Sequence, residues 1–431
     1  MTDPGAGDAA PGGPPDLGLR RWTDRAVVGL ALMALASGFG QFGAVAALGD
    51  VAAHFGRVVH GTSVADQAGL SVTELGVGLA VLRLASLGGL PLSGLADRYG
   101  RRRVLIVTCV GGLAFTVLAA ASPGYWWFVV IFALGRPLLS ATNAVAQVGA
   151  AEETGSSQRA KAIALVAAGY GVGSGLTAVL HGLAKSTLGF RGLFLLAAVP
   201  LAAVFVLQRW LVEPGRFAVA AAAATHPVPV LGAVEPPYRR RLVTVASLAF
   251  AVAVVTGPAN SFVFVYAQNV LKMSGTAQAL MVVVAAGFGL AGLVAGRWLA
   301  DHLGRRPTAA GAMAAMVLTG VLSYSGSRPA LLVGYELAIL AASTFAPAAG
   351  ALANELFPTA VRASVAGWNV AASVVGAVVG LVAFGLLAEA GNRFAVGAEV
   401  TFLPVLGAIA LFALLPETRG REPEDLWPDP A

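Results

Sequence analysis

Charged side chains are scarce in this chain. Only 12% of its 431 residues are charged, while 57% are hydrophobic. Because a soluble domain carries about 25% charged residues, water is not the main solvent of this fold. The composition is typical of a protein surrounded largely by lipid.

Cysteine and histidine are scarce as well. The single Cys109 lies in an apolar run, so it forms no disulfide within the chain and does not report on the redox compartment. The five His residues are scattered, and no nucleophile or metal-ligand cluster accompanies them. We therefore expect a protein that is not an enzyme, has no metal site and needs no cofactor.

Long apolar runs, in contrast, are abundant. Twelve runs have about the 20 residues that span a bilayer, and they are centred near residues 37, 82, 112, 138, 171, 200, 253, 287, 315, 340, 374 and 405. They are continuous rather than alternating, which favours helices over a β-barrel. The sequence thus predicts an all-α membrane protein with twelve transmembrane helices. Residues 1–25 are rich in Pro, Gly and Asp and lack the apolar core of a signal peptide, so we expect a disordered cytoplasmic tail there.

The basic residues are distributed unevenly along this path. With the N-terminus inside, 20 of the 28 Lys and Arg residues fall on the inner side, six fall outside, and two, Arg83 and Arg136, fall within spans. This asymmetry follows the positive-inside rule. We expect both termini to be cytoplasmic and no nucleic acid as partner, in spite of the net charge of +6. The use of 25 Arg against three Lys suggests a GC-rich bacterial genome, and hence the inner membrane.

Two halves of the chain repeat one plan. The pattern LADxxGRR of residues 95–102 recurs at 299–306, an offset of 204 residues. A second set of charged residues recurs at an offset of 203, Glu152 with Glu355 and Arg159 with Arg362. Two coincidences of this kind indicate a duplication. We expect six-helix bundles at 26–212 and 241–416, a cytoplasmic linker at 213–240 and a cytoplasmic tail at 417–431.

These features resemble the major facilitator superfamily. The two LADxxGRR loops, the twelve spans and the central linker carry the resemblance, although Ser93 and Arg297 stand where the family usually has Gly. LPETRGREPEDL at 415–426 and ELFPTAVRAS at 355–364 are nearer to the sugar porters and organic-ion transporters than to the drug antiporters. The resemblance implies two pseudosymmetric bundles that rock about a central site.

The resemblance also implies a role for the repeated charges. They would form clusters that hold the two halves together on the cytoplasmic face when the cavity opens outward. The gating residues expected on this basis are Asp97, Arg101, Glu152, Arg159, Asp301, Arg305, Glu355 and Arg362. The alternative is an anchor that only fixes topology, but an acid such as Asp97 adds nothing to positive-inside anchoring.

A polar stripe runs along the fourth span. Arg136, Ser140, Asn143 and Gln147 stand at spacings of 0, 4, 7 and 11 residues, which places them on one helix face. A lipid-facing stripe would be unfavourable. It therefore faces either a water-filled cavity or a hydrogen-bonded seam with a neighbouring helix.

Two more ionisable residues lie at membrane depth, where charges are costly and usually functional. Arg83 stands ~21 Å up its helix from the Asp97 loop, and either contacts an anionic part of a solute or pairs with an acid. Glu336 shares a helix face with Ser343. It is either a proton carrier or the partner of an Arg, and the sequence leaves both alternatives open.

Further polar residues resemble the cavity lining of sugar porters. They are Gln41 in the first span, Asn260 and Tyr266 in the seventh, where Pro258 should interrupt the helix, and Trp368 and Asn369 in the eleventh. Val254 and Val255 stand where sugar porters carry a Gln pair, and Gln41 replaces their proton-linked Asp. These departures count against a sugar as the solute.

The predicted function is solute transport by alternating access. Because Arg83 and Arg136 outnumber Glu336 within the spans, we expect an anionic or zwitterionic metabolite, carried by a symporter, antiporter or uniporter. The expected partners are this solute, a proton or other coupling ion and the bilayer, and we expect a monomer. The alternatives are a drug/proton antiporter and a sensor or scaffold that transports nothing.

Overall fold

The computed structural model describes residues 20–57, 63–213, 231–232 and 234–427. Within these residues the regular secondary structure is helical, and a single β-bridge joins Arg20 to Thr154. The parts of the expected tails and linker at 1–19, 214–230, 233 and 428–431 lie outside the described residues.

The first half forms one bundle, called here the N-bundle. Its helices are α1 (Arg25–Ala46), α2 (Leu48–Phe55), α3 (Val64–Ala68), α4 (Val72–Ala85), η1 (Ser86–Gly88), α5 (Gly89–Gly94), α6 (Ala96–Tyr99), α7 (Arg101–Leu118), η2 (Ala119–Ala121), α8 (Tyr125–Glu153), α9 (Ser156–Leu195) and α10 (Ala198–Leu207). The long α9 holds the fifth span and the beginning of the sixth, which continues through α10, because the chain turns at Gly189, whose φ of 58° lies in the left-handed region that favours glycine.

The second half forms the C-bundle. Its helices are α12 (Pro236–Val265), η3 (Tyr266–Val270), α13 (Gly275–His302), α14 (Arg305–Ser323), α15 (Arg328–Glu355), α16 (Thr359–Ala390), α17 (Phe394–Phe402), η4 (Leu403–Leu414) and η5 (Pro423–Leu426). The helix α12 begins at Pro236, so its first turn occupies the end of the expected linker.

The number of spanning helices agrees with the sequence. Eleven helical segments of the described chain are long and apolar enough to cross a membrane. The ninth predicted span is α14, which is less apolar because it starts on two Arg residues, and it packs between α13 and α15. The prediction of an all-α membrane protein with twelve transmembrane helices in two six-helix bundles is confirmed.

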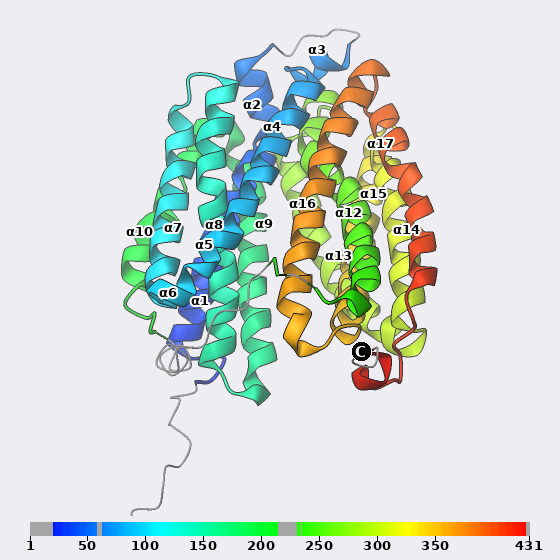
Figure 1. The fold of residues 1–431 in the computed structure, drawn as a ribbon. Helices are drawn as coiled ribbons and strands as arrows, with labels where there is room; N and C mark the ends of the chain where they lie inside the picture. Colours follow the sequence, from blue (N-terminus) through cyan, green and yellow to red (C-terminus); the bar gives the residue numbers. More distant parts are fainter. Residues whose placement is uncertain (1–19, 58–62, 214–230, 233, 428–431) are drawn as a thin grey trace, which may run out of the picture.

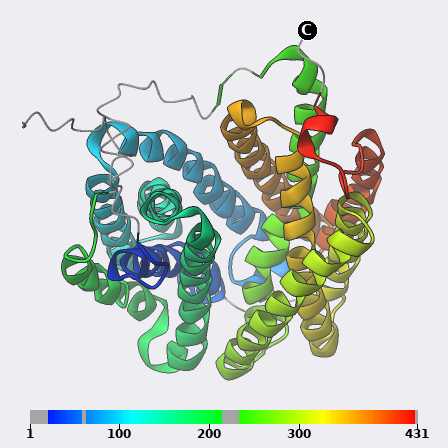
Figure 2. The ribbon, with the colours of Figure 1, turned by 90° about the horizontal axis from the view of Figure 1, so that it is seen from below.

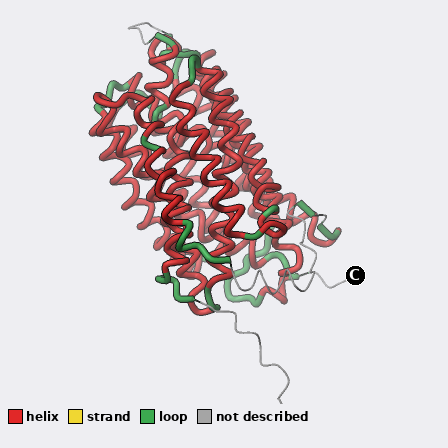
Figure 3. The backbone as a smooth tube through the Cα atoms, turned by 90° about the vertical axis from the view of Figure 1, so that its left-hand side faces the viewer, coloured by secondary structure: helices red, strands yellow, loops and turns green. Residues whose placement is uncertain are grey.

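The two bundles stand side by side with their helices along a common axis (Figures 1 and 3). We call the end that carries α2 and α3 the upper end, and the end that carries α6 and η5 the lower end (Figure 1). Seen from the lower end, α1 to α10 lie on one side and α12 to η4 on the other (Figure 2).

Glycine allows close packing inside the N-bundle. A Cβ on Gly169 would lie 2.3 Å from the Ala31 carbonyl oxygen, and one on Gly173 would lie 2.0 Å from that of Leu35. These approaches bring α9 directly against α1. Gly169 and Gly173 of the glycine-rich run thus serve close helix packing, as small residues do in membrane helices.

The bundles contact each other mainly at the upper end. There α4 packs on α16, where a Cβ on Gly76 would lie 2.5 Å from the Leu381 carbonyl oxygen. The part of α9 around Gly182 packs on the start of α13, where Gly182 and Gly275 face each other's backbone. The structure is therefore in a conformation closed at the upper end.

Pro258 does not interrupt its helix, contrary to the sequence-based expectation. The helix α12 continues through it to Val265 and then widens into the π-helix η3. The hydroxyl of Tyr324 donates to the carbonyl oxygens of Pro258 and Ala259 at 3.4 and 3.1 Å. The helix α12 is therefore continuous in spite of the proline.

Candidate functional site

Arg136 lies between α8 and α1. Its Nη1 donates to the carbonyl oxygen of Gln41 at 2.6 Å, and its buried Nε has no hydrogen-bond partner among the described residues. The Gln41 side chain continues the seam, because its Nε2 donates to Ser37, whose hydroxyl donates to the Leu139 carbonyl oxygen. Arg136 is thus held against the first span with one donor still unused.

Arg83 brings a second positive charge to the same region. It stands in the last turn of α4, directly before the tighter η1, and its side chain is exposed. The two like charges are near enough to repel each other. In the part of the chain that the structure describes, neither Arg forms an ion pair. The region therefore has a surplus of positive charge.

The polar stripe on α8 has more than one environment, and the choice between a cavity and a seam stays a prediction. Ser140 lies in a helix seam, since a Cβ on Gly89 would be 2.8 Å from the Ser140 Cβ. Asn143 and Gln147 are half-buried, and the buried Oδ1 of Asn143 has no partner among the described residues. The stripe thus contains one seam residue and, at Asn143, an acceptor that is free in this conformation.

The C-bundle contributes fewer groups. Glu336 on α15 is buried, and its Oε2 has no hydrogen-bond partner among the described residues. It does not pair with Arg83 or Arg136 in this conformation. Asn369 on α16 likewise has an unpartnered Oδ1, whereas Asn260 donates to the Thr256 carbonyl oxygen of its own helix at 3.0 Å.

Two residues expected in the substrate site lie elsewhere. Tyr266 is 2% exposed, its ring packs on Tyr324 and Phe394, and its hydroxyl accepts from the Gly326 N–H at 3.0 Å. Trp368 lies near the lower end, where its Nε1 donates to the Gly232 carbonyl oxygen at 3.2 Å. We therefore leave both residues out of the candidate site, because aromatic packing fixes the first and a contact with the linker fixes the second.

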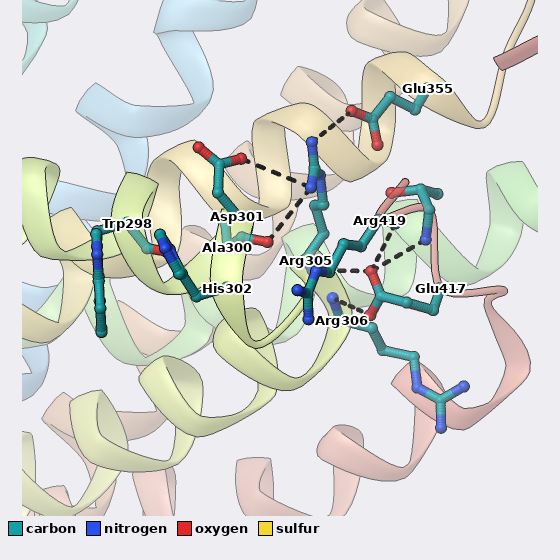
Figure 4. A network of polar contacts seen from close by, with 10 residues as sticks. Trp298, Ala300, Asp301, His302, Arg305, Arg306, Glu355, Glu417 and Arg419 are labelled. Atoms are coloured by element: carbon teal, nitrogen blue, oxygen red, sulfur yellow. Dashed lines mark hydrogen bonds and ion pairs between the residues drawn. The ribbon is translucent and has the colours of Figure 1, made fainter. Parts of the chain in front are cut away.

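Two matching charge clusters lie at the lower end. In the N-bundle, Arg101 pairs with Asp97 and with Glu152, at 2.9 Å from Nη2 to Oε1 of the latter. In the C-bundle, Arg305 pairs with Asp301 at 3.6 Å and with Glu355 at 3.4 Å (Figure 4). Each cluster joins helices of its own bundle.

The remaining two expected gating residues also stay within their bundles. The Nε of Arg362 donates to the Phe357 carbonyl oxygen at 2.9 Å, and the buried Nε of Arg159 has no partner among the described residues. The contact between bundles that the sequence predicts at this end is not formed among the described residues, and it stays a prediction for a conformation that is closed at the lower end.

Sequence reasoning missed one pair of residues at this end. Glu213 accepts from the backbone N–H groups of Arg101 and Arg102 at 2.5 and 3.2 Å, at the start of α7. Glu417 accepts from those of Arg305 and Arg306 at 2.9 and 3.0 Å, at the start of α14 (Figure 4). The two acids stand 204 residues apart, so applying the repeat offset to LVE at 211–213 and LPE at 415–417 would have found them.

The environment of Glu417 favours its ionised form. Burial by itself raises the pKa of this carboxyl, but the backbone N–H groups of Arg419, Arg305, Arg306 and Thr418 outweigh that effect and lower the pKa below its ordinary value. The carboxylate therefore binds the positive end of the α14 helix dipole.

Two models of known protein families match this chain. The family model described as Major Facilitator Superfamily matches residues 30–300, and the one described as Sugar (and other) transporter matches residues 219–427.

Curated relatives match most of the chain. A protein of Cupriavidus pinatubonensis named as a probable 4-methylmuconolactone transporter is 30% identical over 372 residues, which are 82% of this chain and 84% of that protein. The ectoine/proline transporter ProP of Corynebacterium glutamicum is 27% identical and covers 75% of this chain and 72% of its own length.

Solved structures share the fold. The inward open conformation of the xylose transporter XylE from E. coli superposes with a TM-score of 0.71 at 18% identity, over 93% of this chain and 99% of that one. A D-xylose-proton symporter gives a TM-score of 0.72 at 19% identity, over 92% and 99% of the two chains. At these identities the likeness concerns the fold alone.

Proposed function

The chain belongs to the major facilitator superfamily and moves a small solute by alternating access, and we propose that this solute is an organic anion or zwitterion bound between Arg83 and Arg136. One observation carries the proposal. The two side chains bring positive charge to one place at membrane depth, and no acid neutralises it in the described residues.

The free-energy cost of an unpaired charge in the membrane supports this assignment. An unpaired charge inside a membrane protein is expensive and is retained where it has a function. A carboxylate on the solute would supply the missing negative charge and would accept from the unused Nε of Arg136. The amide groups of Asn143 and Asn369, each with a free oxygen, would then contact donors on the rest of the solute.

We propose that the lower end is cytoplasmic. The basic residues of the LADxxGRR loops, including Arg98, Arg102 and Arg306, lie at that end, as the positive-inside rule requires of cytoplasmic loops. Both termini would then be cytoplasmic, in a bacterial inner membrane. The present conformation would be closed to the outside, and the lower-end clusters around Arg101 and Arg305 would contact each other across the bundles in the opposite one.

The names of the relatives support a metabolite rather than a drug. One is named for a lactone and another for ectoine and proline, of which proline is a zwitterion at neutral pH. A drug/proton exporter is not favoured by these relatives. We propose a proton as the coupling ion.

The test removes each positive charge in turn. Arg83→Gln and Arg136→Gln should each weaken uptake of the anion by roughly 10- to 100-fold, because a charge-assisted hydrogen bond contributes about 1.5 to 3 kcal/mol. Arg297→Gln is the matched control, since Arg297 is exposed on α13 and forms no hydrogen bond or ion pair in the described structure. Normal transport by both site variants would refute the assignment.

Glu336 separates this proposal from the exporter alternative. A drug/proton exporter that uses Glu336 as its proton carrier loses all pH-driven efflux in Glu336→Gln. We expect instead that the variant keeps proton-driven transport of an anionic solute. The measurement is solute flux in proteoliposomes with an imposed pH gradient.

A further inference from the structure

A carboxylate of the N-bundle bonds to the C-bundle at the upper end. Asp50 on α2 accepts a hydrogen bond from Nε2 of Gln268 on η3 at 2.5 Å through Oδ1. Its Oδ2 contacts Nε2 of His181 on α9 at 2.7 Å. His181 belongs to the same bundle as Asp50 and orients the carboxylate, whereas Gln268 joins it to the other bundle.

A carboxylate of the C-bundle makes the reciprocal contact. Glu389 at the end of α16 accepts from the hydroxyl of Ser71 at 2.6 Å and from the backbone N–H of Thr73 at 3.0 Å. Both donors lie at the start of α4 in the N-bundle. The upper end is thus closed by two carboxylates that point in opposite directions across the same interface.

Neutral amides make the other described bridges. Asn269 donates to the carbonyl oxygens of Gly49 and Ala68 at 3.0 and 2.7 Å, and Asn392 accepts from the Val64 N–H at 2.7 Å. An Asn side chain does not titrate, so these contacts do not depend on pH. They provide an internal control for the two carboxylates.

Asp50 and Glu389 form their strongest hydrogen bonds across the interface when they are ionised. An ionised carboxylate accepts at both oxygens, and its hydrogen bonds are roughly twice as strong as those between neutral groups. A bound proton turns one oxygen into a donor, which then faces the N–H or O–H groups of the other bundle. A proton therefore binds more weakly to each carboxylate when the upper end is closed than when it is open.

We propose that Asp50 and Glu389 are two proton-binding sites whose occupancy opens the upper end. The inference rests on the rocking motion of the proposed transport cycle. Protons reach both groups from water at the upper end, and a ligand that prefers one conformation shifts the equilibrium toward it. Acid on that side therefore favours the conformation open to that side.

Other titratable groups surround the two sites. On the elements packed against α2 and the end of α16 they are His54, Asp66, Glu74, His181, Arg191, Lys272, Arg393 and Glu399. Arg191 contacts His54 at 3.5 Å, and His181 contacts Asp50. None of the contacts described for these side chains crosses between the bundles. Among the titratable side chains of this region, Asp50 and Glu389 are the ones with described hydrogen bonds across the interface.

The experiment measures the conformation directly, without solute. Spin labels on Thr187→Cys and Ser325→Cys, both exposed at the upper end of opposite bundles, report their separation by pulsed electron paramagnetic resonance, with Cys109 replaced by Ala. As the pH falls from 6 to 3.5, through the ordinary pKa of a carboxyl group, the ratio of open to closed molecules should rise by up to about tenfold per pH unit for each carboxylate. A ratio that does not change with pH would overturn the proposal.

Variants assign the protons to their sites. Asp50→Asn and Glu389→Gln should each halve the slope of the logarithm of this ratio against pH, and the double variant should abolish it. Gln268→Leu, which removes the donor and keeps Asp50, should halve it as well. Asn269→Ala should raise the ratio at every pH and keep the full slope. Retention of the full slope in the double variant contradicts the proposal, and an absence of anion uptake does not affect this measurement.

Discussion

Glu213 and Glu417 make equivalent hydrogen bonds in the two halves of the chain. Each closes the start of a spanning helix by accepting two backbone N–H groups, of Arg101 and Arg102 in one case and of Arg305 and Arg306 in the other. Each therefore ties the end of its own bundle to the loop that carries the LADxxGRR pattern. The repeat is thus one of hydrogen bonds as well as of residues.

Removing the charge of Glu417 should lower stability. Glu417→Gln loses an ionised helix cap, which contributes ~1 kcal/mol, or roughly 1 to 2 °C in apparent Tm for a chain of this size. Because the pKa of Glu417 is lowered in the folded protein, this stability is present at neutral pH and is lost as the pH falls below the ordinary value of 4.5. Thermal unfolding in detergent at pH 7 and pH 4 measures it. An equal Tm difference between variant and wild type at both pH values would contradict the prediction.

Glycine is needed directly before these helices. Gly100 has φ 94° and ψ 143°, and a Cβ there would lie 2.9 Å from Oε2 of Glu213. Gly100→Ala should therefore cost about 2 kcal/mol, from the strained backbone and the displaced carboxylate. Gly94→Ala is the control, because a Cβ at that helical position meets nothing within 4 Å. The prediction fails if the two variants unfold at the same temperature.

A larger residue between the bundles should open the upper end. A Cβ on Gly182 would lie 2.5 Å from the Gly275 carbonyl oxygen, so Gly182→Val separates α9 from α13. We expect a larger open fraction at every pH, measured with the same pair of spin labels. Gly175→Val on the same helix has open space around its Cβ and should leave the fraction unchanged. Similar distance distributions for the two variants would mean that this contact does not hold the bundles together.

Asn143 should react with reagents that enter from the lower end. In this conformation its side chain is half-buried on the α8 stripe, so Asn143→Cys should be modified by a small charged thiol reagent, and solute should slow the modification at least severalfold. Thr142→Cys should stay unreactive, because Thr142 is fully buried and bonds to Thr108 at 3.0 Å. Labelling rates in membrane vesicles measure both. Equal rates with and without solute would place Asn143 outside the solute pathway.

The apolar runs and the repeat determined the architecture. A helix that crosses lipid must satisfy its backbone internally and show an apolar surface. The positions of the spans can therefore be predicted from the apolar runs of the sequence. The repeat offset then paired Asp97 with Asp301 and Glu152 with Glu355, and the structure forms the matching ion pairs in each bundle. Local pattern was sufficient here, because the charges lie at the ends of helices that the sequence already delimits.

The tertiary structure decided which residues meet across helices. The sequence predicts that Tyr266 lines the cavity. In the structure its ring instead packs against Tyr324 and Phe394, which come from other helices. The contact of Asp50 with Gln268 joins residues 218 positions apart, and no repeat or periodicity relates them. Helix rotation and the closed state of the upper end set such contacts. Both depend on packing between whole bundles, which a one-dimensional pattern does not contain.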